Sequence, residues 1–124
     1  MTSVAETLRN SYNKGVTRPL PWRKRQLEQM VKMLEENEAA FLGALATDLG
    51  KPPVEGFITD IAFVTGEVKS MIKKLKKWNK SERVRTPLVT MPARSRLIPE
   101  PLGVVLVIAP WNYPIQLLLV PLLD

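Results

Sequence analysis

The strongest constraint on the fold is the run Val-Val-Leu-Val-Ile at residues 104–108, in which every residue is apolar and four are β-branched. Such a run is typical of a strand that is buried on both faces in a parallel sheet. A loop at residues 110–114 and a leucine-rich segment typical of a helix start follow it. Strand, loop and helix together open a βαβ unit. Because no second strand follows, the sequence predicts an incomplete α/β fold that stops where a sheet domain begins.

The first 50 residues predict amphipathic helices separated by short turns. A short helix is expected over residues 2–14, with Gly15 at its end. A second helix follows residues 17–19, where the Thr17 hydroxyl is expected to cap it and the prolines suit its first turn. Asn37 interrupts this helix, and the helical pattern then continues to Gly50. Apolar residues of the second helix recur at i, i+3, i+4 and i+7, namely Leu27, Met30, Val31 and Leu34.

The third predicted helix has the most regular pattern. Apolar residues keep helical spacing for about five turns between Phe57 and Leu75. The acidic residues Glu55, Asp60 and Glu67 come early and the lysines come late, an order that complements the helix dipole. We therefore assign residues 1–80 to a unit of N-terminal helices.

The sequence changes character after Trp78. Residues 81–103 contain Pro87 and Pro92 among several β-branched residues, which predicts an extended connection or an edge strand. Within it, residues 95–100 fit a short strand. A third unit, residues 104–124, contains the predicted buried strand and is the truncated start of a sheet domain.

Composition excludes several kinds of chemistry. The 124 residues contain neither cysteine nor histidine. This excludes a thiolate nucleophile, a disulfide, a zinc site built from Cys or His, and a Ser-His or Cys-His relay. Catalysis by this chain alone would need carboxylates, Lys, Ser, Thr or Tyr, or a bound cofactor. We predict no metal site. The missing cysteines and a polar N-terminus favour a cytoplasmic protein without a secretory signal.

Two segments allow a binding function. Eight Lys and Arg residues but one acid lie between Lys69 and Arg85, a cluster that suits nucleic acid or phosphoinositide. A solvated helix face is the preferred interpretation, because four of the lysines lie opposite an unbroken apolar stripe. Residues 101–123 are uncharged and long enough to span a bilayer. Pro110, Pro114 and Pro121 disfavour a membrane anchor, since they open the backbone hydrogen bonding. We predict no nucleic-acid partner, and a membrane anchor is the less favoured alternative.

The loop at residues 110–114, Pro-Trp-Asn-Tyr-Pro, is the best candidate for chemistry. The simpler interpretation is a stiff turn whose aromatic side chains pack into a core. The functional interpretation starts from position, because ligands of open α/β sheets collect beyond the carboxyl ends of strands. A fixed amide there, that of Asn112, offers an N–H donor to a developing oxyanion. The six glycines form neither a G-x-G-x-x-G motif nor a P-loop.

Residues 100–114, EPLGVVLVIAPWNYP, resemble the segment that enters the cofactor domain of aldehyde dehydrogenases. The tyrosine at position 113 and the continuation Gln-Leu-Leu are most similar to the class 3 and fatty aldehyde dehydrogenase branch. Upstream, TRPL at residues 17–20, RQL at 25–27 and ALATDLGK at 44–51 also resemble that branch. The resemblance covers essentially the whole chain and implies a Rossmann-like cofactor domain, incomplete here.

The resemblance implies NAD(P)-dependent oxidation of an aldehyde to a carboxylic acid through a cysteine thiohemiacetal. It gives Asn112 the role of the oxyanion amide, and residues 95–100 that of a hairpin used in family homodimers. The resemblance also implies which residues line the cofactor and the substrate. Those facing the cofactor would be Ile108, Ala109, Pro110 and Trp111. Those facing the substrate would be Tyr113, Gln116 and Leu117.

The chain departs from the family in lacking the nucleophile. Because the cysteine and the general base are absent, we expect an N-terminal fragment without dehydrogenase activity of its own. The alternative is a non-enzymatic interaction module. It would be a truncated subunit that pairs with full-length chains, or a basic helical protein with a C-terminal membrane anchor.

Overall fold

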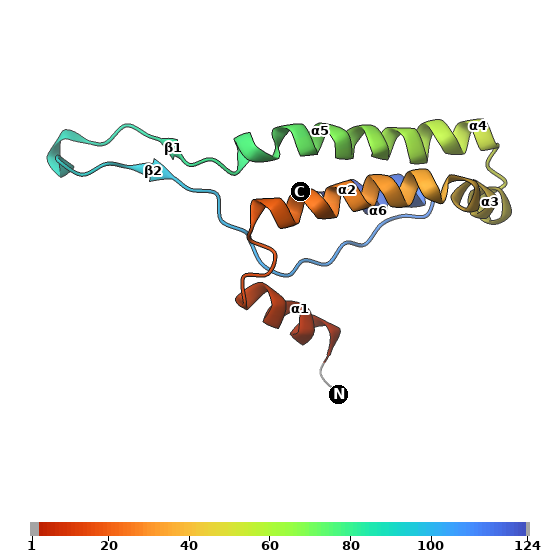
Figure 1. The fold of residues 1–124 in the computed structure, drawn as a ribbon, viewed down its shortest axis with the longest axis horizontal. Helices are drawn as coiled ribbons and strands as arrows, with labels where there is room; N and C mark the ends of the chain where they lie inside the picture. Colours follow the sequence, from red (N-terminus) through yellow and green to blue (C-terminus); the bar gives the residue numbers. More distant parts are fainter. Residues whose placement is uncertain (1–2, 124) are drawn as a thin grey trace.

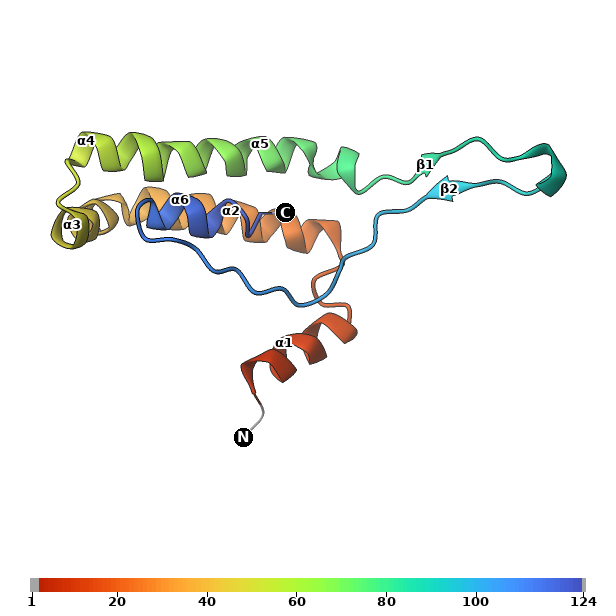
Figure 2. The ribbon, with the colours of Figure 1, turned by 180° about the vertical axis from the view of Figure 1, so that it is seen from behind.

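A computed structural model describes residues 3–123, which form a small helical bundle with one extended arm (Figure 1). Figure 2 shows the same arrangement from behind, with α2, α5 and α6 together and α1 set apart below them. The elements in chain order are α1 (Val4–Asn13), α2 (Leu20–Glu36), α3 (Glu38–Leu49), α4 (Pro53–Gly56), η1 (Phe57–Ala62), α5 (Phe63–Trp78), β1 (Glu82–Arg83), η2 (Leu88–Thr90), β2 (Arg96–Leu97) and α6 (Pro114–Leu119).

The core lies between α2 and the segment formed by η1 and α5. Leu34 of α2 and Val64 and Val68 of α5 are each 0 % exposed, and Leu27 and Ile61 complete the buried cluster. Burial of such a side chain contributes about 1.5–3 kcal/mol. Ile115 and Leu119 of α6 pack against this cluster. The predicted apolar stripe of the second helix is therefore confirmed. That of the third helix is confirmed from Ile61 to Leu75, whereas Phe57 and Ile58 at its start are exposed.

Most predicted helix ends agree with the structure. Ser3 caps α1 in a capping box with Glu6, and Gly50, at φ +62°, ends α3. Asn37 separates α2 from α3, as predicted. The cap predicted at Thr17 is wrong, because α2 begins after Pro19 and has no side-chain cap. The Thr17 carbonyl instead accepts a hydrogen bond of 2.8 Å from Arg23 Nε.

The third predicted helix is continuous but not uniform. It comprises α4, then a π-helix, η1, over Phe57–Ala62, and then α5. A π-helix is widened by its i→i+5 hydrogen bonds and changes the face that later residues present. In η1 it places Asp60 and Ile61 on the buried side. The sequence pattern predicted the helix but not the π-helix.

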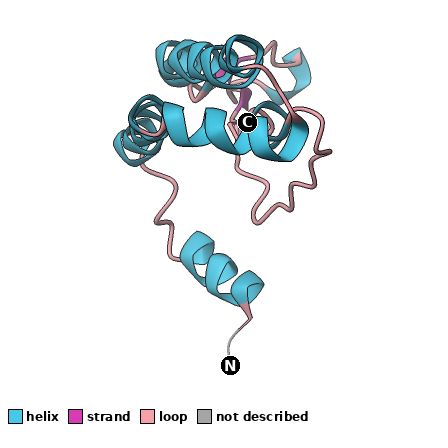
Figure 3. Cartoon of the chain, turned by 90° about the vertical axis from the view of Figure 1, so that its right-hand side faces the viewer, coloured by secondary structure: helices cyan, strands magenta, loops and turns pink. Residues whose placement is uncertain are grey.

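An arm projects from the bundle after α5 (Figure 1). Its strands β1 and β2 pair antiparallel, with Glu82 opposite Leu97 and Arg83 opposite Arg96. The strand expected within residues 95–100 is thus present over Arg96–Leu97. This pair is the one sheet in the described part of the chain, and Figure 3 shows how little strand accompanies the helices.

The buried strand predicted at residues 104–108 is wrong. These residues are extended but belong to no sheet, and Leu106 and Ile108 are 83 % and 84 % exposed. The physical reason is that a parallel strand needs neighbours, and none of the strands within residues 3–123 pairs with this run. The described chain is consequently mostly helical with one two-stranded antiparallel sheet, and residues 3–123 contain no parallel sheet of the predicted α/β fold. Tyr12 ties α1 to the start of this connection by donating a hydrogen bond of 2.8 Å to the Pro101 carbonyl.

Two lysines of the basic cluster at residues 69–85 contact neighbouring side chains of the helices. Lys69 pairs with Glu35 at 2.8 Å, and Lys74 lies 5.6 Å from the centroid of the Trp78 ring. Among residues 3–123, no helix is both long enough and apolar enough to cross a membrane.

Candidate functional site

The predicted loop connects the extended residues 104–109 to α6. Asn112 is exposed, and its side-chain amide has no hydrogen-bond partner among the described residues. The backbone that follows Asn112 is anchored, because α6 begins directly after Tyr113 and packs against η1 and α5. A free amide on an anchored backbone is therefore available to an incoming polar group.

A buried ion pair lies directly beneath this loop. Lys51 Nζ is 2.8 Å from Asp60 Oδ2, and the two side chains are 6 % and 0 % exposed. The hydroxyl of Thr59 lies 3.1 Å from the same carboxylate oxygen and 2.8 Å from the Glu55 carbonyl. The ion pair therefore joins the connection between α3 and α4 to η1.

Both charged groups also contact the loop. Lys51 Nζ donates to the Asn112 carbonyl at 3.4 Å and lies 4.0 Å from the centroid of the Tyr113 ring. Asp60 Oδ1 accepts the backbone N–H groups of Ile115 and Gln116 at 3.2 and 3.3 Å. The loop and the first turn of α6 are therefore held from below by one ammonium and one carboxylate.

The local sequence explains how the pair is assembled. Gly50 turns the chain in a left-handed conformation, so Lys51 leaves α3 toward the interior. Gly56 then allows α4 to approach α3, since a Cβ atom there would lie 3.1 and 3.2 Å from the side chains of Leu42 and Leu45. The π-helix that follows turns Asp60 into the same space.

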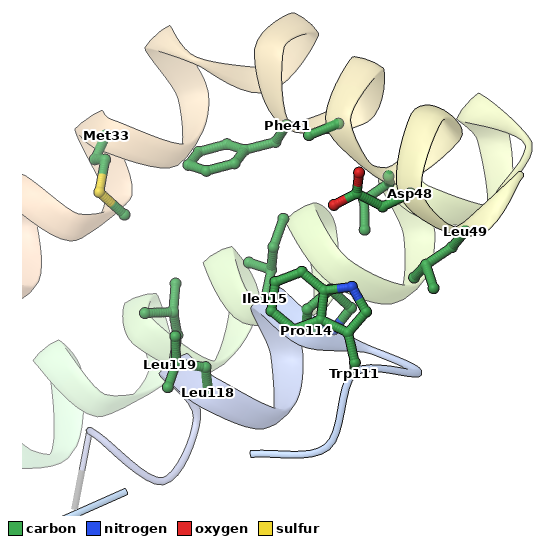
Figure 4. A pocket seen from close by; sticks show the side chains of 11 residues that line it. Met33, Phe41, Asp48, Leu49, Trp111, Pro114, Ile115, Leu118 and Leu119 are labelled. Carbon is green, nitrogen blue, oxygen red and sulfur yellow. The ribbon is translucent and has the colours of Figure 1, made fainter. Parts of the chain in front are cut away.

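An apolar groove of about 340 Å³ opens beside the loop (Figure 4). Trp111 and Pro114, which flank Asn112 and Tyr113, form one wall, and α2 and α3 form the opposite wall. Asp48 is its one charged lining side chain. The eleven lining residues are Met33, Phe41, Ala44, Leu45, Asp48, Leu49, Trp111, Pro114, Ile115, Leu118 and Leu119.

The structure brings the predicted site residues together only in part. Trp111 lines the groove, whereas Ile108 and Pro110 are exposed outside it and Ala109 is half-buried. Tyr113 faces the Lys51 ammonium. Gln116 contributes its backbone N–H to Asp60, and Leu117 is half-buried beside groove residues 118 and 119.

The residues present do not by themselves fit a dinucleotide cofactor. Residues 108–110 do not line the groove, and the one charged side chain that does is the Asp48 carboxylate, which would repel a pyrophosphate. Likewise, residues 3–123 contain no cluster of three or more acidic groups that could hold a metal ion.

The sequence reasoning missed Lys51 and Asp60. A signal was present, because Asp60 interrupts an apolar stripe next to Ile61, and a buried acid needs a charged or hydrogen-bonded partner. The sequence pattern places Asp60 only among the early acids that complement the helix dipole, whereas the structure shows that its side chain is fully buried.

Comparison with known proteins gives a consistent result. Residues 5–123 match the family model described as the aldehyde dehydrogenase family. The chain is 38 % identical over 122 residues to aldehyde dehydrogenase family 3 member H1 of Arabidopsis thaliana, and 42 % identical over 115 residues to family 3 member B1 of Homo sapiens. These alignments cover 98 % and 93 % of this chain.

A solved structure described as the substrate-bound state of Staphylococcus aureus AldH superposes with a TM-score of 0.92 at 38 % identity, over 99 % of this chain. The match covers 28 % of that structure, and the alignments cover 25 % of each relative. The chain thus spans about a quarter of the length of the curated relatives it matches.

Proposed function

Because this chain belongs to the aldehyde dehydrogenase family, we propose that it carries the oxyanion-binding part of a site that oxidises aldehydes to carboxylic acids. The observation that supports this most directly is the Asn112 side chain, which is exposed beside an apolar groove on an anchored backbone and has no other partner among residues 3–123. When a nucleophile adds to an aldehyde, the carbonyl oxygen becomes an oxyanion. An amide N–H held in place stabilises that oxygen more than the ground-state carbonyl.

The chain provides the hydrogen-bond donor that binds the oxyanion and not the nucleophile. Its 124 residues contain no cysteine, so no thiolate of this chain can attack the carbonyl. NAD or NADP would accept the hydride in the family reaction. The proposal for Ile108, Ala109, Pro110 and Trp111 is that they form the wall facing that cofactor. They could do so only with further residues, since alone they form no dinucleotide site.

The groove favours an aldehyde with an apolar substituent. Its lining is aliphatic and aromatic except for Asp48, and it begins beside the Asn112 loop (Figure 4). Burial of an alkyl chain there contributes about 0.8 kcal/mol for each methylene group. A fatty aldehyde fits this lining. The proposal that Tyr113, Gln116 and Leu117 contact the substrate rests on the family resemblance, since none of the three lines the groove.

The test uses a chimaera in which residues 5–123 replace the matching segment of Staphylococcus aureus AldH. Turnover of an alkyl aldehyde is followed by the absorbance of reduced nicotinamide. Asn112→Ala is expected to lower kcat by about 10²–10³-fold with little change in KM, because the lost interaction acts on the transition state. Asn13→Ala, the same change at an exposed site on α1, is the control and should leave kcat unchanged.

Two outcomes would contradict this function. One is an inactive chimaera that is folded, and the other is full activity of the Asn112→Ala chimaera. A further expectation concerns the isolated chain, which should produce no reduced nicotinamide above a buffer blank. Steady production would show that the missing cysteine is not required.

The projecting arm supports a second proposal, that the protein pairs with further copies or with full-length subunits. Leu88 and Val89 at its tip are 83 % and 93 % exposed, and its short strands leave unpaired edges. Light scattering after size exclusion tests this, because Val89→Asp should shift a dimer toward monomer if the arm forms the interface. An unchanged dimer would exclude the tip of the arm from the contact.

A further inference from the structure

We propose that Lys51 and Asp60 are positioning residues that hold the Asn112 loop from both of its ends. The proposal rests on the function assigned to Asn112 and names the groups that orient it. Lys51 holds the carbonyl side of Asn112 and the face of Tyr113, and Asp60 holds the N-terminal amides of α6. Neither side chain touches the reacting atoms.

The carboxylate of Asp60 replaces a cap that the local sequence does not provide. The residue before α6 is Tyr113, which makes no side-chain cap, and Pro114 follows it at the first helical position. Asp60 Oδ1 accepts the N–H groups of the second and third helical residues, which are the groups that an N-cap side chain normally satisfies. A residue more than 50 positions earlier in the chain therefore fixes where α6 begins and where the loop ends.

The ammonium of Lys51 fixes the other side of the same loop. Its three protons face Asp60 Oδ2 at 2.8 Å, the Asn112 carbonyl at 3.4 Å and Thr59 Oγ1 at 3.5 Å, while the Tyr113 ring covers it at 4.0 Å. Holding the Asn112 carbonyl sets the peptide plane that follows Asn112. Holding that plane and the start of α6 restricts the backbone torsions at Asn112, and so limits the directions in which its side chain can point.

Burial distinguishes this pair from the other ion pairs of the chain. Lys69 and Glu35 lie at the same 2.8 Å, but their side chains are 54 % and 56 % exposed, and neither makes a second side-chain hydrogen bond among residues 3–123. A buried pair is weak evidence for stability, because desolvation offsets much of the attraction. Beyond their mutual attraction, Lys51 and Asp60 make hydrogen bonds and a cation–π contact to the Asn112 loop and the first turn of α6.

The experiment measures backbone hydrogen exchange by NMR on the full 124-residue chain, so that it does not depend on turnover. The main variant is Lys51→Met with Asp60→Leu, which removes both charges while keeping the stem of one side chain and the branching of the other. Replacement of a buried pair by apolar groups of similar volume often preserves stability. Lys69→Met is the matched control, because it breaks a pair of equal length that contacts no loop.

We expect the amides of Ile115 and Gln116 to exchange about 5- to 30-fold faster in the double variant, measured relative to the core amides of Val68 and Leu34. The control should leave this ratio unchanged. The proposal is overturned if the ratio keeps its wild-type value, or if every amide accelerates by the same factor, as a purely structural role predicts.

Asp60→Asn supplies a second, milder variant should the double variant fail to fold. The amide oxygen keeps the acceptor for Ile115 and Gln116, so their protection should be retained, whereas the contact with Lys51 weakens and the Tyr113 ring signals should shift. If Asp60→Asn instead removes the exchange protection of Ile115 and Gln116 together with that of the core amides, the positioning role is contradicted.

Turnover in the chimaera gives a second readout of the same role. The double variant should lower kcat about 10–100-fold and leave KM within about twofold, which is the pattern expected when a group is misplaced. An inactive wild-type chimaera would refute the proposed function while leaving the exchange result to decide the role of the pair.

Discussion

Removal of one charge from each of two ion pairs with equal N–O distances tests how burial controls their energy. The chain offers this comparison directly, since Lys51–Asp60 and Lys69–Glu35 both measure 2.8 Å. The variants are Lys51→Met and Lys69→Met, which delete the same ammonium from the same kind of stem. Any difference in the free energy of unfolding therefore reports the surroundings of the partner carboxylate.

The structure predicts a large difference. Lys51→Met leaves the fully buried Asp60 carboxylate without its counter-charge, and removal of one partner of a buried pair costs about 3–5 kcal/mol. The two amides of Ile115 and Gln116 still solvate this carboxylate, which favours the lower end of that range. Lys69→Met leaves Glu35 in water, where an exposed pair contributes less than about 1 kcal/mol.

Urea unfolding followed by circular dichroism measures both values. The midpoint should fall steeply for Lys51→Met and barely for Lys69→Met, with similar slopes because the surface exposed on unfolding is unchanged. Equal losses in the two variants would refute the reasoning. So would a loss below about 1 kcal/mol for Lys51→Met, since burial would then have no energetic consequence.

Three further predictions follow from the packing of individual residues. Gly66→Ala should stabilise the protein by about 0.5–1 kcal/mol, because α5 has open space for a Cβ atom there. Gly56→Ala should stabilise it less or destabilise it, because its Cβ atom would crowd the side chains of Leu42 and Leu45. The order of the urea midpoints checks this prediction. Val68→Ala should lower the free energy of unfolding by about 2–4 kcal/mol, and Leu106→Ala by less than about 0.5 kcal/mol. A large loss for Leu106→Ala would show that residues 104–108 are buried after all. Tyr12→Phe should cost about 0.5–1.5 kcal/mol and speed amide exchange in α1, and unaltered exchange there would show that the bond to Pro101 does not hold the helix.

Local patterns in the sequence predicted the helices because the information is local. Leu27 and Leu34 on one helix, and Val64 and Val68 on another, follow helical spacing, and the same residues form the core. Gly50 was recognisable as a helix end because a left-handed residue there favours glycine. The local sequence also suited a helix cap at Thr17. In the structure, however, Pro19 precedes the first residue of α2, and the Thr17 carbonyl accepts a hydrogen bond from Arg23.

Features that depend on distant partners were not predictable in this way. Residues 104–108 have the composition of a buried strand, yet composition cannot supply the neighbouring strands that such a strand pairs with. Asp60 and the amides it binds are separated by 55 and 56 positions, so no window of the sequence contains both. The candidate site was found through Asn112, whereas the pair that holds it required the structure.

The most direct test of the central claim is a double-mutant cycle on kcat in the chimaera, since it asks whether Lys51 and Asp60 act through Asn112. The four proteins are the parent chimaera, Asn112→Ala, Lys51→Met with Asp60→Leu, and the combination of all three changes. If the pair only positions Asn112, the combined variant should have the kcat of Asn112→Ala within about twofold, because nothing remains to position. If the separate losses multiply instead, the pair acts independently of Asn112 and the account is contradicted.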